Sequence, residues 1–176
     1  MKKYEFTGET KQVELWNRTA MLHRIRATVE FGFVKVGELG GWIEKEENLS
    51  HEGKAWVCGD AKVWGNAKVC GDAEVWGNAE VWGNAKVCGD AEVWGNAEVF
   101  LASHVLVMGP VGSRNDFTTF FRDKDNEITV KCGCFLGKID KFLEKVTQTH
   151  GNNKYALVYR AAVEVAKLQI ELTERK

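Results

Sequence analysis

The sequence lacks any long hydrophobic run, and this absence excludes a helix that crosses a membrane. No apolar stretch among the 176 residues approaches the roughly 20 residues that a bilayer span requires. The first ten residues, MKKYEFTGET, contain two lysines but no apolar segment after them, so they do not form a signal peptide. We therefore expect a protein without membrane contact, located in the cytoplasm.

The chain also lacks a strong charge of either sign. It carries 24 Lys and Arg against 25 Asp and Glu, so it has no basic stripe of the kind that a general nucleic-acid binder needs. The charge is uneven, however. Residues 54–107 hold 4 basic and 7 acidic side chains, whereas residues 108–176 hold 12 basic and 9 acidic ones. The C-terminal part is therefore the more favourable place for an anionic ligand.

Histidine and cysteine are few, and their spacing argues against a metal centre. The four histidines are His23, His51, His104 and His150. No two of them share a short motif, so the three-histidine site of γ-type carbonic anhydrases is not expected. Cys132 and Cys134 supply only half of a structural zinc site. We expect neither a metal nor a cofactor.

The five cysteines do not indicate a disulfide framework. Their number is odd, and three of them occupy a position of a repeat that tryptophan also occupies. A chain without such a framework is typical of a reducing compartment, which agrees with the expected location in the cytoplasm of a bacterial cell.

What the sequence has in abundance is a six-residue repeat, V-[W/C]-G-[N/D]-A-[K/E]. Valine recurs every six residues from Val57 to Val99, and alanine precedes each valine by two positions. Ala-x-Val has the two-residue period of a strand, and the Gly-Asn or Gly-Asp that follows predicts a turn. A glycine in every hexad would cost about 1 kcal/mol each inside a helix, so a helix is excluded.

The hexads resemble the hexapeptide repeat of left-handed parallel β-helices, which implies three hexads per triangular coil and about four coils. Positions 18 apart then stack in columns. The residue after valine gives three columns: Cys58, Trp76 and Trp94; Trp64, Trp82 and Phe100; and Cys70, Cys88 and Leu106. Two columns are mainly aromatic and one holds thiol or aliphatic side chains. This sorting independently favours a three-sided coil.

The aromatic columns are expected to point outward, because alanine and valine fill the interior. Stacked rings stabilise neighbouring coils by about 0.5–1.5 kcal/mol per pair, and this is one interpretation of the columns. A wide apolar stripe is also typical of an interface, which predicts a homo-oligomer, a trimer or a multiple of it. The predicted interface residues are Trp64, Trp76, Trp82, Trp94 and Phe100.

Other segments must cover the strand edges at the two ends of a solenoid. We predict a β-rich cap over residues 1–53, in which Ile43 and Leu49 begin an irregular first coil, and a hexad solenoid over residues 54–107. Residues 108–176 are expected to form a ββαα module. Its strands lie in FTTFFRDKDNEITVKCGCF, and its helices lie in GKIDKFLEKVTQTHG and NNKYALVYRAAVEVAKLQIEL. The fold class is therefore mainly β.

Several motifs together resemble those of phage and prophage hexapeptide-repeat proteins, often labelled polymer-forming cytoskeletal or hexapeptide-transferase-like. The motifs are LHRIRA, LGGWIEKEENLSHEG, the GNA hexads, VGSRNDFTTFF, VKCGCFLGKIDKFLEKV and HGNNKY. The resemblance covers most of the chain. It implies a setting, a bacterium and its phage, and no particular activity.

Acyl transfer is one chemistry to weigh, because many proteins with this repeat resemble one another in being acyltransferases with a catalytic histidine. In those enzymes the histidine often lies on a loop that interrupts the repeat. Here the hexads run without insertion, and His104 is the only histidine in or beside them. A general base needs a positioned partner and a substrate cleft, so catalysis by His104 is the less favoured interpretation.

Anion binding is the best remaining chemistry. The turn GPVGSRND offers backbone amides and a guanidinium, and HGNNKY lies at the start of a predicted helix, where anions are favoured. The candidate ligand-binding residues are Arg24, Arg26, Ser113, Arg114, Thr118, Thr119, His150, Lys154 and Tyr155. Ordinary loop and surface roles are the alternative for each of them.

Three functions are open at this point. The favoured one is a binding protein without turnover that captures an anionic small molecule, a nucleotide signal of bacterial immunity, and so serves the phage as a counter-defence sponge. The second is an inhibitor or scaffold that uses its rigid side to bind a protein, such as a host immune protein. The third is a hexapeptide-type acyltransferase.

Overall fold

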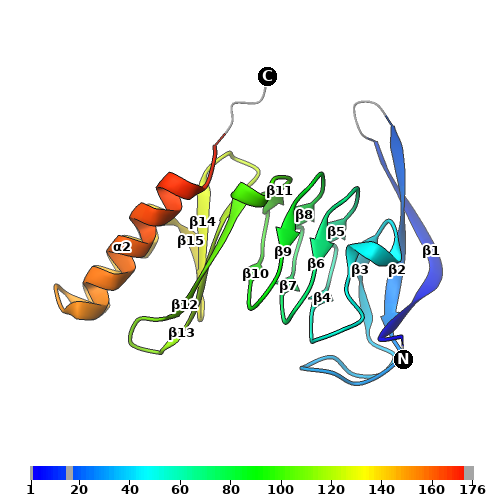
Figure 1. Cartoon of the computed structure of the whole chain (residues 1–176), viewed down its shortest axis with the longest axis horizontal. Coiled ribbons are helices and arrows are strands. Elements are labelled where there is room, and N and C mark those ends of the chain that lie inside the picture. Colours follow the sequence, from blue (N-terminus) through cyan, green and yellow to red (C-terminus); the bar gives the residue numbers. More distant parts are fainter. Residues whose placement is uncertain (1, 15–17, 173–176) are drawn as a thin grey trace.

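The computed structural model describes residues 2–14 and 18–172. Along its long axis the molecule is a row of parts: an N-terminal hairpin, a stack of short coils, and a C-terminal sheet with helices beyond it (Figure 1). None of the helices in these described ranges is long and apolar enough to cross a membrane.

The hexads form a parallel β-solenoid. Its two-residue strands are β4 (Trp56–Val57), β5 (Lys62–Val63), β6 (Lys68–Val69), β7 (Glu74–Val75), β8 (Glu80–Val81), β9 (Lys86–Val87), β10 (Glu92–Val93) and β11 (Glu98–Val99). Parallel pairs join β4 to β7 and β7 to β10, β5 to β8 and β8 to β11, and β6 to β9. Paired residues are always 18 apart. The three-sided coil is confirmed, and its regular coils number about three, against the four predicted.

The interior of the solenoid is the predicted ladder of alanine and valine, all of them buried from Ala55 to Val99. Each corner turns at a glycine with positive φ. Gly71 has φ 70°, and a Cβ there would lie 2.8 Å from the backbone nitrogen of Gly89 in the next coil. A side chain at this corner is therefore unfavourable for two reasons: the backbone is left-handed, and the next coil is stacked against it.

The N-terminal cap extends one flank of the solenoid. The antiparallel strands β1 (Tyr4–Glu14), β2 (Thr19–Ala27) and β3 (Leu39–Ile43) continue through the parallel pair of β3 and β5 into a six-stranded sheet, β1-β2-β3-β5-β8-β11. A short 3-10 helix, η1 (Glu46–Asn48), follows β3. Ile43 pairs with Val63 and Leu49 bridges to Val69. These pairings place Ile43 and Leu49 beside the first regular coil.

Side chains complete the closure of this end. The Lys3 ammonium donates to the carbonyl oxygens of Ala55 at 2.8 Å and Gly53 at 3.4 Å. The Asn48 side-chain amide donates to Ala67 O at 2.8 Å and to Gly65 O at 3.2 Å. Carbonyls that would otherwise be buried without donors are thereby satisfied.

The C-terminal part holds more strands than predicted. A second 3-10 helix, η2 (Ala102–His104), leads into an antiparallel sheet of β12 (Val105–Val111), β13 (Asp116–Arg122), β14 (Ile128–Cys132) and β15 (Phe135–Lys138). The two predicted strands are β13 and β14. The ββαα description missed β12, which contains Gly109 and Pro110, residues that usually mark a break, and the short strand β15.

The two predicted helices are present as α1 (Ile139–His150) and α2 (Lys154–Gln169). α1 ends at Gly151, whose φ is 57°, as a C-cap glycine does. The C-terminal sheet lies between the solenoid and the helices. Phe121 belongs to the core of the solenoid, and its neighbour Phe120 belongs to the core under the helices. The predicted inner face of α2 is buried there: Ala156, Tyr159, Val163, Ala166 and Ile170.

The third column of the solenoid differs from the prediction. Leu106 lies in β12 and pairs with Phe120, so the column consists of Cys70 and Cys88 alone, and these form a disulfide. Stacking of positions 18 apart brings their Cα atoms to 4.6 Å, within the range that a disulfide spans. The exchange of cysteine and tryptophan in the repeat concealed this pairing. Because disulfides are rare in reducing compartments, the pair does not support the expected cytoplasmic location.

Candidate functional site

The two aromatic columns are continuous stacks. Trp64 and Trp82 lie parallel at 5.1 Å between ring centroids, and Trp82 stacks on Phe100 at 4.9 Å. In the other column, Trp76 and Trp94 are 5.4 Å apart. The stacking predicted from the 18-residue spacing is therefore present, and it stabilises coil on coil.

These columns are only partly exposed. Trp64 is only 2 % exposed, because Ala20, Leu22 and Trp42 of the N-terminal sheet cover it. The remaining rings are half-buried. Phe33 packs on Trp76 at 5.3 Å, and cations lie over the other column ends. The interface role of Trp76, Trp82, Trp94 and Phe100 stays a prediction. For Trp64 to contact a partner, the hairpin of β1 and β2 that covers it would have to move.

Arg24 and Arg26 lie on β2, at the end of the molecule opposite the C-terminal candidates (Figure 1). The Arg24 guanidinium lies 5.2 Å from the centroid of the Trp42 ring, and Arg26 forms an ion pair with Glu5. Within one protomer, neither arginine joins the other predicted ligand-binding residues.

Thr118 and Thr119 are buried in β13, and their hydroxyl groups already have partners inside the protein. Thr118 Oγ1 lies 3.2 Å from Cys132 Sγ, and Thr119 Oγ1 accepts a hydrogen bond from the backbone nitrogen of Glu92 at 2.9 Å. Thr119 thus closes the C-terminal end of the solenoid. Since both residues are about 1 % exposed, neither is available to a ligand.

The other five candidates come together, and we call them the tip cluster: Ser113, Arg114, His150, Lys154 and Tyr155. They lie where the turn between β12 and β13 meets the connection between α1 and α2. Ser113 Oγ is 3.5 Å from His150 Nε2. The rings of His150 and Tyr155 are 5.9 Å apart, and Lys154 Nζ lies 5.0 Å from the Tyr155 ring centroid.

Two glycines make room for the tip cluster. A Cβ on Gly133 would lie 2.3 Å from Arg114 Nη1, and a Cβ on Gly112 would lie 1.9 Å from the Tyr159 hydroxyl oxygen. Burial, and after it Cys132, raise the pKa of Tyr159 to about 12, while Arg114 opposes the shift. Tyr159 thus reaches the cluster as a neutral phenol. Its place on the buried face of α2 gave no sign of this in the sequence.

The backbone at the start of α2 contributes less than expected. The side chain of Asn153 accepts hydrogen bonds from the backbone nitrogens of Tyr155 at 2.9 Å and Ala156 at 3.1 Å. These are two of the N–H groups that an anion at a helix N-terminus would use. An anion at the tip cluster must therefore be held mainly by side chains.

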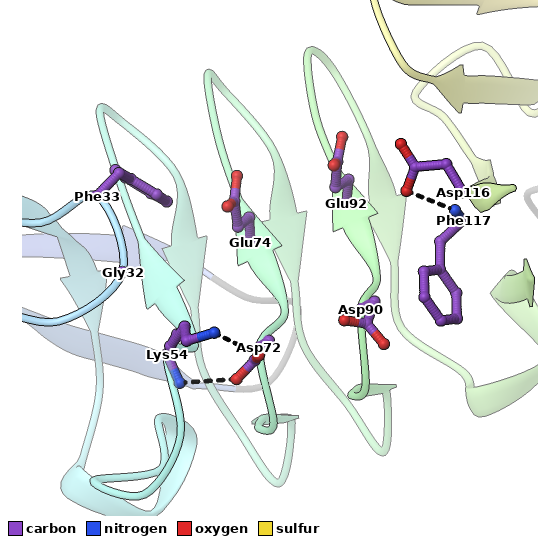
Figure 2. Close-up of a pocket in the computed structure, with 9 residues that line it drawn as sticks. All are labelled: Gly32, Phe33, Lys54, Asp72, Glu74, Asp90, Glu92, Asp116 and Phe117. Atoms are coloured by element: carbon purple, nitrogen blue, oxygen red, sulfur yellow. Dashed lines mark hydrogen bonds and ion pairs between the residues drawn. The ribbon is translucent and has the colours of Figure 1, made fainter. Parts of the chain in front are cut away.

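A hollow, which we call the acidic groove, crosses one side of the coils. It measures about 240 Å³, with Phe33 at one end and Phe117 at the other (Figure 2). Its carboxylates are Asp72, Glu74, Asp90, Glu92 and Asp116. Among the described residues that line the groove, the one cation is Lys54, 3.4 Å from Asp72; Lys131, beside the groove, forms an ion pair with Glu92.

The charge of the acidic groove favours cations and repels anions. Burial, followed by the neighbouring Glu92, raises the pKa of Glu74 above its usual range. Two of its carboxylate pairs, Asp72 with Asp90 and Glu74 with Glu92, are 18 residues apart. The repeat spacing therefore predicts that these carboxylates stack, and the groove could have been predicted from the sequence.

His104 is enclosed by the protein. Its Nδ1 accepts a hydrogen bond from the backbone nitrogen of Phe100 at 3.4 Å, and its ring is fully buried. Burial and then Arg122 lower the pKa of His104 to about 4. The residue closes the last coil and does not face a cleft, which a general base requires.

Cys132 and Cys134 have no third ligand beside them, and no group of three potential metal ligands occurs within residues 2–14 and 18–172. Two groups of polar side chains are thus described: the tip cluster, which includes Arg114, His150 and Lys154, and the acidic groove. No protein-family model matches the chain, and no curated protein matches its sequence. Its function is inferred from these two sites.

Proposed function

We propose that the protein binds an anionic, phosphate-bearing small molecule at the tip cluster and releases it unchanged. The observation that carries the proposal is the 3.5 Å approach of Ser113 to His150, which joins a hairpin turn to a helix connection 37 residues further along the chain. Arg114 follows Ser113 in the chain and Lys154 begins α2 four residues after His150, so both cations belong to the two segments that meet here. Among the described residues, no carboxylate forms an ion pair with Arg114 or Lys154.

The residue types suit a nucleotide. A guanidinium binds a phosphate with two parallel hydrogen bonds, and an ammonium adds a point charge. The rings of His150 and Tyr155 give a base a surface on which to stack. The excess of positive charge over residues 108–176 further favours an anion at this end of the molecule.

Turnover is less well supported than binding. Ser113 and His150 have the residue types of a nucleophile and its base, but 3.5 Å exceeds the roughly 2.6–3.2 Å of an activated pair. A catalytic histidine is also oriented by a third group through its other nitrogen. Within the described part of the chain, no hydrogen bond to His150 Nδ1 is formed.

The resemblance to phage proteins supports a biological setting for this proposal. In a bacterial cell infected by phage, a protein that captures a nucleotide immune signal acts as a sponge, and the signal would be met in the cytoplasm. The same resemblance supports a left-handed course for the solenoid. Trimeric assembly through the half-buried tryptophans is part of the same proposal.

The test is calorimetry against a panel of cyclic dinucleotides and ADP-ribose derivatives. A charge-assisted hydrogen bond contributes roughly 1.5–3 kcal/mol, so Arg114→Ala should weaken binding about tenfold or more. Arg18→Ala, which removes an exposed arginine paired with Glu44 outside the candidate site, is the matched control and should bind as the wild type does. Each ligand is recovered and analysed afterwards.

The outcomes separate the three functions. Binding of an unchanged ligand, weakened by Arg114→Ala alone, supports the sponge. An altered ligand would identify an enzyme and implicate Ser113 and His150. No binding across the panel, with the protein folded, would overturn the proposal in favour of a protein partner.

A further inference from the structure

α2 is apolar on two faces. Its inner face packs on the C-terminal sheet, as described above. Its outer face is made of Leu157, Val158, Ala161, Val165 and Leu168, all exposed. Leu168 is 88 % exposed and Leu157 is 58 % exposed. We call these five residues the outer face.

A helix with apolar residues around most of its circumference is typical of a buried helix. Five of the eleven large hydrophobic side chains exposed among the described residues lie on the outer face or just after it, at Leu172. α2 lies at the extreme end of the molecule, with its outer side turned away from the sheet (Figure 1). Apolar patches of this kind mark contact sites.

The spacing on the outer face is that of a helix-pairing seam. Val158, Ala161, Val165 and Leu168 are separated by three, four and three residues, as the core positions of a heptad are. We propose that the outer face of α2 binds the outer face of a second copy of this chain, with the two helices antiparallel about a two-fold axis.

Side-chain size supports the antiparallel arrangement. When two copies of α2 run in opposite directions with Val165 near the axis, Leu168 of each lies opposite Ala161 of the other. The most exposed leucine then fills the space beside the smallest residue of the seam, as close packing requires. A two-fold contact repeats this fit twice.

Charge supports the same arrangement. Glu164 and Lys167 lie along one flank of the seam and form an exposed ion pair at 2.9 Å within the helix. In the antiparallel pair, the same flank of both helices meets, and Glu164 of each copy lies opposite Lys167 of the other. In a parallel two-fold pair this flank would face a different one. The self-complementary order of size and charge identifies a second copy as the occupant.

The contact is expected to be of modest affinity. A helix of 16 residues is about 24 Å long, and a stable interface buries about 800 Å² on each partner. One helical face covers only part of that area. Dimerisation should therefore depend on concentration.

Sedimentation of the full chain from about 1 μM to about 200 μM tests the proposal. The mass of the wild type should double as the concentration rises, whether the species at low concentration is a monomer or the proposed trimer, and Leu168→Glu should shift the dissociation constant at least tenfold, because it places two charges in each α2 pair. Since Leu168 is 88 % exposed, circular dichroism and the melting temperature should be unchanged. Val36→Glu, exposed at 65 % far from α2, should dimerise normally.

Charge reversal tests the orientation. Glu164→Lys alone should weaken the dimer several-fold, since it creates two contacts between lysines, and adding Lys167→Glu should restore it. A wild type whose mass stays constant throughout, or a doubling that Leu168→Glu leaves intact, would overturn the proposal. A dimer insensitive to both charge variants would overturn the antiparallel arrangement.

Discussion

The two ends of the solenoid are closed by different means. At the N-terminal end the backbone continues: β3 adds a parallel strand, and the backbone nitrogens of Trp42 and Glu44 donate to Ala61 O at 2.9 Å and Val63 O at 3.1 Å. At the C-terminal end backbone pairing is reduced to an isolated bridge between Ala97 and Asp123 and a hydrogen bond from Lys124 N to Asn96 O at 3.0 Å, and side chains satisfy other backbone groups. Thr119 accepts from one backbone nitrogen of the last coil, as shown above, and His104 accepts from another.

The difference decides where single residues matter. Lys3 and Asn48 also contribute side-chain hydrogen bonds at the N-terminal end, but the backbone pairing there uses groups that every residue carries, so this part of the closure tolerates many side chains. Closure at the C-terminal end depends on the particular atoms of a few side chains. We therefore expect substitutions there to cost more stability than comparable ones at the N-terminal end.

Two arginine–glutamate pairs provide the largest test. Arg122 is 1 % exposed, and its Nη1 lies 3.2 Å from both the Glu98 carbonyl and its carboxylate. Removing one partner of a buried pair costs about 3–5 kcal/mol, so Arg122→Met should lower the free energy of unfolding by that amount in urea titrations.

The matched control is Arg18→Met at the N-terminal end. Arg18 approaches Glu44 more closely, at 2.6 Å, but its side chain is 45 % exposed. Exposed pairs contribute less than about 1 kcal/mol. Equal losses for Arg18→Met and Arg122→Met would contradict the contrast between the two ends.

Between the ends, the disulfide should be the next largest contribution. It closes a loop of 18 residues, and the loss of chain entropy in the unfolded state predicts about 3 kcal/mol. Reductant should lower the midpoint of urea unfolding of the wild type. Cys88→Ser should unfold at that lower midpoint with or without reductant, whereas the free thiol variant Cys58→Ser should keep the response. A wild type insensitive to reductant would show that the bond does not form in solution.

The two ends should also respond to pH in separate windows. Burial lowers the pKa of His104 from 6.5 to about 4, so the unfolded chain takes up a proton that the folded chain refuses. Stability should fall as pH drops from about 6.5 to 4, by up to about 3 kcal/mol. Burial also lowers the pKa of Lys3 from 10.5 to about 8, and stability should rise as pH increases from 8 to 10.5.

Two variants test which end of the solenoid causes each pH dependence of stability. In unfolding titrations across pH, His104→Gln should flatten only the acidic slope, and Lys3→Met should flatten only the alkaline one. If one variant changed both slopes, the two ends would not titrate independently.

The smallest expected difference in stability is between two corners of the same edge of the solenoid, Gly71, which is covered by the next coil, and Gly89, which is not. Gly71 and Gly89 share a φ of 70°, so alanine at either costs about 1–2 kcal/mol. Gly71→Ala must also displace the coil above it, whereas a Cβ on Gly89 meets nothing within 4 Å. Thermal unfolding should therefore show a larger loss for Gly71→Ala. Equal losses would mean that the corners are not tightly stacked.

The coils were predictable from the sequence because each depends on six local residues and their spacing. Val57, Val75 and Val93 had to stack once the period was three hexads. The closures were not predictable, since Lys3 and Asn48 reach carbonyls that are distant in the sequence. The covering of Trp64 by Leu22 depends in the same way on a hairpin that no repeat specifies.

The candidate site was predictable in part. The residues of the tip cluster were named because loops with glycine and cations indicate anion binding, and the fold brings five of them together. Thr118 and Thr119 failed as candidates because burial in the middle strands of a sheet leaves no sign in a short polar motif. Arg24 and Arg26 do not join the cluster within one protomer, because sequence alone does not say which end of an elongated molecule a strand occupies.

Because its two ends are closed separately, the solenoid determines both the distance between the two caps and their relative rotation. β3 pairs with the first coil and β13 lies over the last, so neither cap sets the number of coils between them. An insertion of 18 residues would lengthen the molecule by about 4.8 Å and leave the caps facing the same directions. An insertion of a single hexad would instead turn the C-terminal module by a third of a revolution about the solenoid axis. The number of whole coils therefore sets the distance between the two caps. Additional single hexads set the rotation of one cap about the solenoid axis. Insertions could thus change the distance and the orientation of the tip cluster relative to the hairpin independently.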